Sequence, residues 1–419
     1  MLKRHYLTLS LLLVYGIATG QKTLEMVDKA YEPEIKTVLC YPNQPTEGNT
    51  LLPAVARMDA QSLMLEFDDL REERQNYYVK LIHCNFDWSK SSLMDLDFLH
   101  DYNEFLINDY SFSINTQVPY VHYRFTVPPV KIPGNYLIII YRDGKRQDLI
   151  VSRRIVVFES KLDIVMDEEI AGLGNIQNTN QALNFMINYG RTEIVNPLGS
   201  MHVTIRQNQR WDNAKQDVKP NFIREDINQL EYRFFDMDKT FQGGNEFRFV
   251  NFRSLNYPGQ NTLRLDKGHK PYDLFVNIDK PRLFQSYAQY PDINGNYYPD
   301  NADYQQEPWI SANYLYVNFA LQTPAMKGDV YVIGAFNGWA RTEENKMTYD
   351  QGMYSKRMLL KQGFYNYAYW TAPPEPDGNQ IEGNHFQTEN LYEVLVYYHA
   401  FQPNADLLIG YFVIPVNAR

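Results

Sequence analysis

The sequence predicts an all-β fold of tandem, immunoglobulin-like β-sandwich domains. Aromatic residues make up 15% of the 419 residues, with 33 Tyr and 23 Phe, and aromatic side chains favour the half-buried surface of a strand. Apolar and polar residues alternate in short runs that are bounded by Gly, Pro, Asn and Asp, which is the pattern of antiparallel strands. Few stretches show a helical period of adequate length.

The first 20 residues have the pattern of a cleaved secretory signal peptide. Lys3 and Arg4 precede an apolar run at 6–18, and residues 18–20 supply small side chains at the cleavage site. A membrane anchor is the alternative, but the run is short for about 30 Å of hydrocarbon. We therefore expect an exported protein with a mature chain of about 400 residues, enough for two to four domains.

The charge and the cysteine content narrow the function classes. The net charge is −10, so nucleic acid and anionic lipid surfaces are poor partners. Cys40 and Cys84 are the two cysteines. They could form one bridge in an oxidising compartment, but two cysteines do not make a disulfide framework.

Residues 21–160 are predicted to form the N-terminal sandwich. Turns at 133–135 and 143–144 separate apolar runs, and residues 93–107 are interpreted as a helical excursion or a long loop. About seven short antiparallel strands in this length suit an immunoglobulin-like sandwich. The expected strands are 34–40, 62–67, 77–86, 110–114, 122–127, 136–141 and 151–157.

Two further sandwiches are predicted, at 161–285 and at 286–419, with 290–300 as a linker. The expected middle strands are 163–165, 182–189, 202–207, 230–235, 246–252 and 272–278. The expected C-terminal strands are 314–321, 329–333, 354–360, 364–370, 392–398 and 407–413.

Candidate catalytic and metal-binding motifs are weak. His83 and Cys84 are neighbours on a strand, so their side chains point to opposite faces and cannot form a nucleophile–base pair. Residues 292–296 resemble a calcium loop, but Gly295 falls at the fourth position instead of the sixth, and Asn294-Gly295 is a strong hairpin signal. Residues 243–246 lack the spacing of a phosphate loop. We therefore expect no enzyme, no metal and no cofactor.

Residues 329–367 carry the sharpest single motif. Gly334-Ala-Phe-Asn-Gly-Trp339 follows an apolar strand, and 363–367 ends the next hairpin. This arrangement resembles the early-set, glycogen-binding β-sandwich. Ala368 stands where that family has its glucan-binding lysine, and 371–376 replaces the turn that carries its second sugar-stacking tryptophan. We therefore expect Trp339 to be a packing residue.

Ordered motifs run along the whole mature chain, at 35–38, 41–42, 65–70, 78–88, 108–110, 207–213, 243–249, 253–255, 292–295, 381–385, 388–390 and 396–398. Together they resemble the plug proteins of the type IX secretion system. The resemblance implies a non-enzymatic periplasmic protein that sits at the inner side of the outer membrane. It implies one copy in a hetero-complex with the translocon channel, whose periplasmic mouth it seals when idle. A glycan-binding sandwich protein of the periplasm or cell surface is the alternative.

Two loops of the middle unit are predicted to form a partner-binding surface, because Arg and Trp are enriched at protein interfaces and glycines adapt a loop to a partner. The alternative is that Trp211 caps the core of the middle sandwich. The candidate residues are Arg210, Trp211, Asp212 and Asn213 in one loop and Gly243, Gly244, Asn245 and Glu246 in the other.

Overall fold

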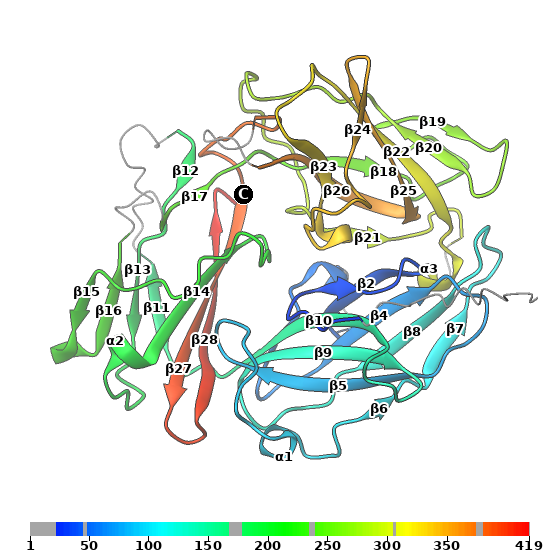
Figure 1. Ribbon diagram of the computed structural model, residues 1–419. Coiled ribbons are helices and arrows are strands. Elements are labelled where there is room, and N and C mark those ends of the chain that lie inside the picture. The colour runs from blue at the N-terminus through cyan, green and yellow to red at the C-terminus, as the bar shows by residue number, and fades with distance from the viewer. Residues whose placement is uncertain are drawn as a thin grey trace, which may run out of the picture.

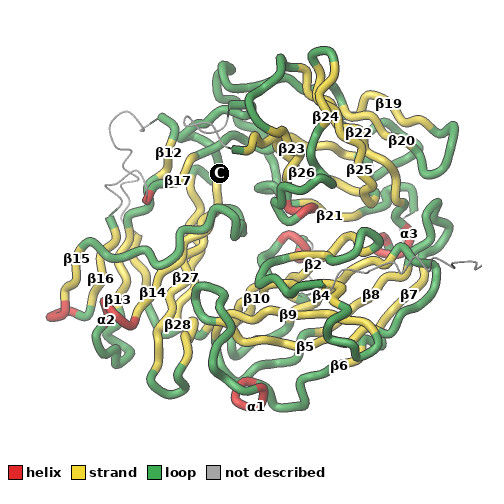
Figure 2. The backbone as a smooth tube through the Cα atoms, in the orientation of Figure 1, coloured by secondary structure: helices red, strands yellow, loops and turns green. Residues whose placement is uncertain are grey.

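A computed structural model describes residues 22–44, 48–166, 178–233, 239–304, 307–373 and 380–418. The predicted signal peptide, 1–20, lies outside this part of the chain. The described residues form mainly antiparallel sheets joined by loops, with a few helices of one turn (Figure 2), which confirms the predicted all-β class. No helix among them is long and apolar enough to cross a membrane.

The N-terminal sandwich packs two sheets face to face. One sheet has the order β2 (Ile35–Pro42), β4 (Leu63–Asp69), β8 (Val121–Thr126), β7 (Asp109–Phe112). The other has the order β1 (Lys29–Ala30), β10 (Leu149–Phe158), β9 (Gly134–Arg142), β5 (Tyr77–Cys84), β6 (Phe105–Leu106), and β3 (Val55–Arg57) runs parallel to β10. All seven predicted strands are present. The predicted excursion at 93–107 contains α1 (Asp95–Phe98) and β6, and the one-turn η1 (Asn49–Leu51) precedes β3.

Side-chain alternation on β5 shows how this domain is built. Tyr77, Val79 and Leu81 are fully buried in the core between the two sheets. Tyr78 and Ile82 face outward, where they join a second apolar cluster that includes residues of the C-terminal hairpin. The outer face of this sheet is therefore covered by the next domain.

The middle domain contains a different set of strands from the predicted one. It contains β11 (Asp163–Met166), β12 (Asn180–Gln181), β13 (Phe185–Asn188), α2 (Pro197–Ser200), β14 (Met201–Gln207), β15 (Phe222–Arg224), η3 (Glu225–Ile227), β16 (Gln229–Tyr232), β17 (Phe241–Gln242), β27 (Asn390–Ala400) and β28 (Ala405–Val416). The sheets are β11-β13-β16-β15, β12-β17 and β14-β27-β28. β27 pairs with β14 from Met201↔Tyr398 to Gln207↔Tyr392.

The predicted boundary between 161–285 and 286–419 is therefore wrong for the last hairpin. Its strands form as predicted, but they complete the core of the middle domain together with residues 162–241. The physical reason is that buried side chains on β27, such as Val394 and Val396, need an apolar partner surface, and β14 supplies it. A period-two pattern predicts a strand but not its partner.

The third sandwich is inserted between β17 and β27. Its strands and helices are β18 (Arg248–Asn251), β19 (Thr262–Asp266), β20 (Asp273–Val276), β21 (Tyr297–Pro299), α3 (Pro308–Ser311), β22 (Tyr314–Gln322), β23 (Asp329–Ile333), η5 (Ala335–Asn337), β24 (Thr348–Asp350), β25 (Met353–Lys361) and β26 (Gly363–Ala372). The predicted middle strands at 246–252 and 272–278 belong here. The predicted linker at 290–300 is also wrong, because β21 pairs Tyr297 with Tyr365 in the sheet.

The three sandwiches surround a common centre (Figure 1). Lys361 of the inserted sandwich lies with its Nζ 2.6 Å from Oδ2 of Asp68 in the N-terminal sandwich, and both side chains are at most 1% exposed. Tyr314 donates its hydroxyl hydrogen to the same carboxylate at 2.6 Å. Between the N-terminal and middle domains, the Tyr397 hydroxyl donates to Asn135 at 2.9 Å. The domains are thus joined by buried polar contacts as well as by their loops.

Candidate partner-binding site

The first predicted loop follows directly from β14. Asn208 and Gln209 both adopt a left-handed conformation, with φ of 52° and 62°, which L-residues rarely adopt without support. The support is explicit: the Asn208 side chain donates to Asn390 Oδ1 at 2.7 Å and accepts from the Leu391 backbone N–H at 2.8 Å. Gln209 donates to the carbonyl oxygen of Leu51 in the N-terminal sandwich at 2.8 Å. The loop is therefore held in one position.

The second predicted loop follows β17 and uses its glycines for close backbone approach. A Cβ at Gly243 would lie 2.1 Å from the carbonyl oxygen of His385, and Gly244 has a φ of 69°. The Gly244 N–H donates to Asn384 Oδ1, and its carbonyl oxygen accepts from the His385 N–H, both at 2.7 Å. Only glycine fits the first position, and glycine is favoured at the second.

The tertiary structure brings the two loops to one cavity of about 240 Å³, between the middle domain and the inserted sandwich. Arg210, Asn213, Gly243, Gly244 and Asn245 line it. Five of the eight predicted residues thus share one site. The inserted sandwich contributes residues that the sequence analysis did not select, namely Phe247, Arg282, Ile333, Trp370 and Glu382.

The other three predicted residues lie elsewhere. Trp211 packs edge-on against Trp88 of the N-terminal sandwich with ring centroids 4.9 Å apart, and the Arg206 guanidinium lies 4.4 Å from its ring centre. Asp212 is exposed and forms ion pairs with Arg210 and Arg341, at 2.7 and 3.1 Å.

Glu246 is buried, accepts from the Tyr287 hydroxyl and has a pKa raised chiefly by burial. Trp211 is thus a packing residue, but it packs against the N-terminal sandwich and does not cap the core of the middle domain, as the alternative predicted.

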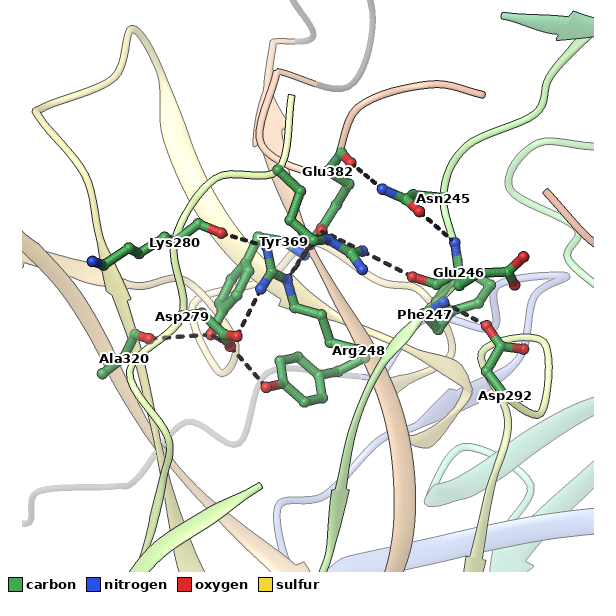
Figure 3. Close-up of polar contacts among 12 residues, drawn as sticks. Asn245, Glu246, Phe247, Arg248, Asp279, Lys280, Asp292, Ala320, Tyr369 and Glu382 are labelled. Atoms are coloured by element: carbon green, nitrogen blue, oxygen red, sulfur yellow. Dashed lines mark hydrogen bonds and ion pairs between the residues drawn. The ribbon is translucent and has the colours of Figure 1, made fainter. Parts of the chain in front are cut away.

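A buried ion network supports one wall of the cavity (Figure 3). Arg248 on β18 contacts both carboxylate oxygens of Glu382 at 3.0 Å and pairs with Asp279 at 2.7 Å. Arg282 pairs with the same Glu382 at 2.7 Å, and the Tyr369 N–H donates to it at 2.8 Å. Burial alone would raise the pKa of Glu382, but the two guanidinium groups lower it overall. The network therefore keeps this carboxylate charged.

Sequence analysis missed this network because its members come from four separate segments. Residues 243–249 and 381–385 were noted as motifs of the family resemblance, which is the one signal that could have found Arg248 and Glu382. Asp279 and Arg282 lie in no recognisable pattern. They meet the other two because the inserted sandwich brings these segments together, with β18 paired to β26.

The remaining sequence candidates are structural. The Asn294-Gly295 pair forms the predicted turn, with φ of 52° and 79°. Asp292 accepts from the backbone N–H groups of Phe247 and Asn294, and burial raises its pKa to about 7. Within the described part of the chain, no group of three or more His, Cys, Asp or Glu side chains could hold a metal ion.

Trp339 and the His83–Cys84 pair also lie in packed positions. Trp339 is 7% exposed, and the Arg210 guanidinium lies 4.1 Å from the centre of one of its rings. His83 packs on Tyr136 and Phe98, whereas Cys84 belongs to the cluster on the outer face of the same sheet. Both cysteines are buried and free.

Comparison with known proteins gives three results. Residues 35–159 match the family model described as the type 9 secretion system plug protein, first domain. No curated protein matches the sequence. A crystal structure of a hypothetical protein from Parabacteroides merdae is similar over 94% of this chain and 100% of that chain, with 27% identity and a TM-score of 0.86.

Two further solved structures have TM-scores too low to indicate a shared fold. An Escherichia coli alpha-2-macroglobulin activated by porcine elastase has a TM-score of 0.18, with 8% identity over 91% of this chain and 30% of that one. A marsupial T cell receptor has a TM-score of 0.15, with 9% identity over 91% of this chain and 100% of that one.

The match to the family model shows that the N-terminal sandwich is similar to the first domain of type 9 secretion system plug proteins. Over residues 35–159, the family resemblance predicted from the sequence is therefore confirmed.

Proposed function

We propose that this protein is a non-enzymatic component of the type IX secretion system that binds the periplasmic mouth of the outer-membrane translocon channel and seals it when idle. The similarity of residues 35–159 to the plug-protein first domain is the observation that carries the proposal. It indicates a function related to type 9 secretion. We further propose a periplasmic location at the inner side of the outer membrane, with one copy of the chain in a hetero-complex.

Contacts between the domains support a role as a stopper. A body that blocks a wide pore must keep its shape under load, whereas domains in one chain move relative to each other by default. Here each pair of domains shares a specific polar contact: Lys361 with Asp68, Tyr397 with Asn135, and Arg341 with Asp212. The buried charge pair tolerates little displacement, because separating it would leave a charge without a partner in the interior.

Deletion of the gene tests the proposal. A steric seal stabilises the closed state and contributes nothing to transport itself. The deletion strain should therefore become permeable to antibiotics or dyes too large for porins, while secretion of type IX clients continues at least in part. The channel must be present at its normal level, and the wild-type gene on a plasmid should restore the barrier. Unchanged permeability with a normal amount of channel would refute the proposal.

The alternative, binding of glycans through the early-set motif, is less well supported by the geometry. Trp339 is the aromatic residue that would stack on a sugar, and it is 93% covered by its own protein. A pull-down with soluble polysaccharides separates the two functions, because specific retention would favour glycan binding and would not follow from a role as a seal.

A further inference from the structure

A small cavity lies between the N-terminal sandwich and the middle domain, where the edge of β10 away from β9 is locally unpaired. β1 pairs with this edge as far as Ser152, and β3 pairs with it again from Val156. Between them, the backbone N–H of Arg154 donates to the Asp28 carboxylate at 2.6 Å. This β10 cavity encloses about 30 Å³, which is room for about two water molecules.

The lining of the β10 cavity carries more positive than negative charge. Its cationic residues are Arg153 and Arg154 on β10 and Arg206 on β14, and its anionic residue is Asp28. Arg206, whose side chain is 4% exposed, pairs with Glu393 at 2.6 Å. Arg153 pairs with Asp28 at 3.3 Å. Three guanidinium groups therefore share two carboxylates.

Arg154 is the guanidinium group without a carboxylate partner. The two carboxylates pair with the other two arginines, and within the described part of the chain the Arg154 side chain forms no ion pair. Its Nε donates to the neutral carbonyl oxygen of Met26 at 2.8 Å. The guanidinium lies 4.6 and 5.5 Å from the ring centres of Trp88 and Trp211, and such contacts offset only part of the cost of removing a charge from water. Burial lowers the pKa of Arg154, and the nearby charge of Arg206 lowers it further.

Two hydrogen-bond donors of the lining residues are also unused. The Nε atoms of Arg153 and Arg206 are buried and have no hydrogen-bond partner among the described residues. A buried N–H without an acceptor costs free energy, and a buried charge without a partner costs more. Water in the cavity can accept from these donors, but it leaves the excess positive charge in place. An anion removes both costs.

The walls of the β10 cavity are fixed before any ion enters. Gln209 lines the cavity and donates to the carbonyl oxygen of Leu51 at 2.8 Å. Trp211 also lines it and packs edge-on against Trp88, with ring centroids 4.9 Å apart. An ion that binds here does not have to order these side chains, so more of the contact energy appears as affinity.

The volume of the cavity selects among anions. A halide ion is somewhat larger than one water molecule and accepts N–H groups from any direction, whereas polyatomic anions such as phosphate need more room. From the volume, the charge count and the unused donors, we infer that the β10 cavity binds one halide ion, which joins β10 of the N-terminal sandwich to β14 of the middle domain. The site belongs to the folded chain alone and does not rest on the proposed function.

Thermal denaturation of the purified chain tests the site in solution. Sodium chloride replaces sodium gluconate at constant ionic strength, so that screening stays the same while the bulky anion gives way to one that fits the cavity. A ligand that binds only the folded state stabilises it further as its concentration rises above Kd. We expect the melting temperature to rise by about 2 °C for each tenfold increase in chloride above Kd.

Arg154→Met removes the excess charge and keeps most of the side-chain volume, so it should abolish the rise with chloride. The matched control is Arg146→Met, which makes the same change at a side chain that is 54% exposed in the same domain and should keep the rise. Equal responses of the wild-type, Arg154→Met and Arg146→Met proteins would indicate a general salt effect and would overturn the inference.

Asp28→Asn changes the charge in the opposite direction. It removes one carboxylate but keeps an oxygen that can accept from the Arg154 N–H. The added excess of positive charge should shift the onset of the rise to a chloride concentration about tenfold lower. An unchanged onset would overturn the inference, and this result is decisive even if Arg154→Met does not fold.

Crystallography with bromide locates the ion. Crystals of the wild-type protein grown with bromide in place of chloride should show one anomalous peak in the β10 cavity, and crystals of Arg154→Met should lack it. Absence of the peak from the wild-type crystals would overturn the inference. A peak without any effect of chloride in solution would mean an adventitious ion only and would overturn it as well.

Discussion

Replacing Lys361 with methionine should weaken the contact between the N-terminal sandwich and the inserted one. The Lys361 Nζ lies 2.6 Å from the Asp68 carboxylate, 2.6 Å from the Trp309 carbonyl oxygen and 4.2 Å from the centre of the Tyr120 ring. Methionine keeps most of the apolar volume, so the loss is mainly electrostatic. The substitution leaves the Asp68 carboxylate fully buried without its ammonium partner, and removing one partner of a buried ion pair costs about 3–5 kcal/mol.

The partners of the Asp68 carboxylate keep it charged in the folded protein. Burial by itself would raise the pKa of Asp68, but Lys361 and His122 lower it overall. In the Lys361→Met variant, His122 and Tyr314 still contact this side chain, so part of the stabilisation of the charge remains. We therefore expect a destabilisation near the lower end of the range, about 3 kcal/mol.

The assay is a double-mutant cycle followed by urea denaturation. Lys356→Met is the matched control, because Lys356 lies on the same strand and bonds at the surface; it should change the free energy of unfolding by less than about 0.5 kcal/mol. Asp68→Asn combined with Lys361→Met should cost less than the sum of the two single changes by at least about 1 kcal/mol. Equal effects of Lys361→Met and Lys356→Met, or strict additivity in the cycle, would refute the reasoning.

Three further outcomes are expected. Trp339→Ala should lower the free energy of unfolding by about 3–5 kcal/mol, because it empties a packed site; a stable variant with lost polysaccharide binding would contradict this. Burial lowers the pKa of His83 to about 4, so the unfolded chain binds more protons between pH 6.5 and 4. Stability should therefore fall by up to about 3 kcal/mol as the pH drops through this window, and a pH series of His83→Leu should lack that component. Burial raises the pKa of the Cys40 and Cys84 thiols to about 12; mass spectrometry should show alkylation by iodoacetamide at pH 8 only after denaturation, and rapid labelling of the folded protein would refute this.

Local patterns were sufficient for most strands and for part of the site. Alternation along Tyr77–Cys84 and the turn at Asn294-Gly295 are specified by neighbouring residues, so they could be predicted without a partner. The prediction that 210–213 and 243–246 form a partner-binding surface rested on residue type and on their position in loops. Arg282 and Trp370, which complete the cavity, have no local signal because nothing near them in sequence marks a binding site.

The sequence by itself determined the all-β class, the strands of the N-terminal sandwich and its family resemblance, because each depends on short-range periodicity or on ordered motifs. The tertiary structure alone decided that β27 and β28 return to β14, that the third sandwich is an insertion, and that the two predicted loops share one cavity. These features depend on which buried faces fit each other across about 190 residues of chain, as with Ile205 and Val394. That complementarity is a property of packed surfaces, and no local pattern encodes it.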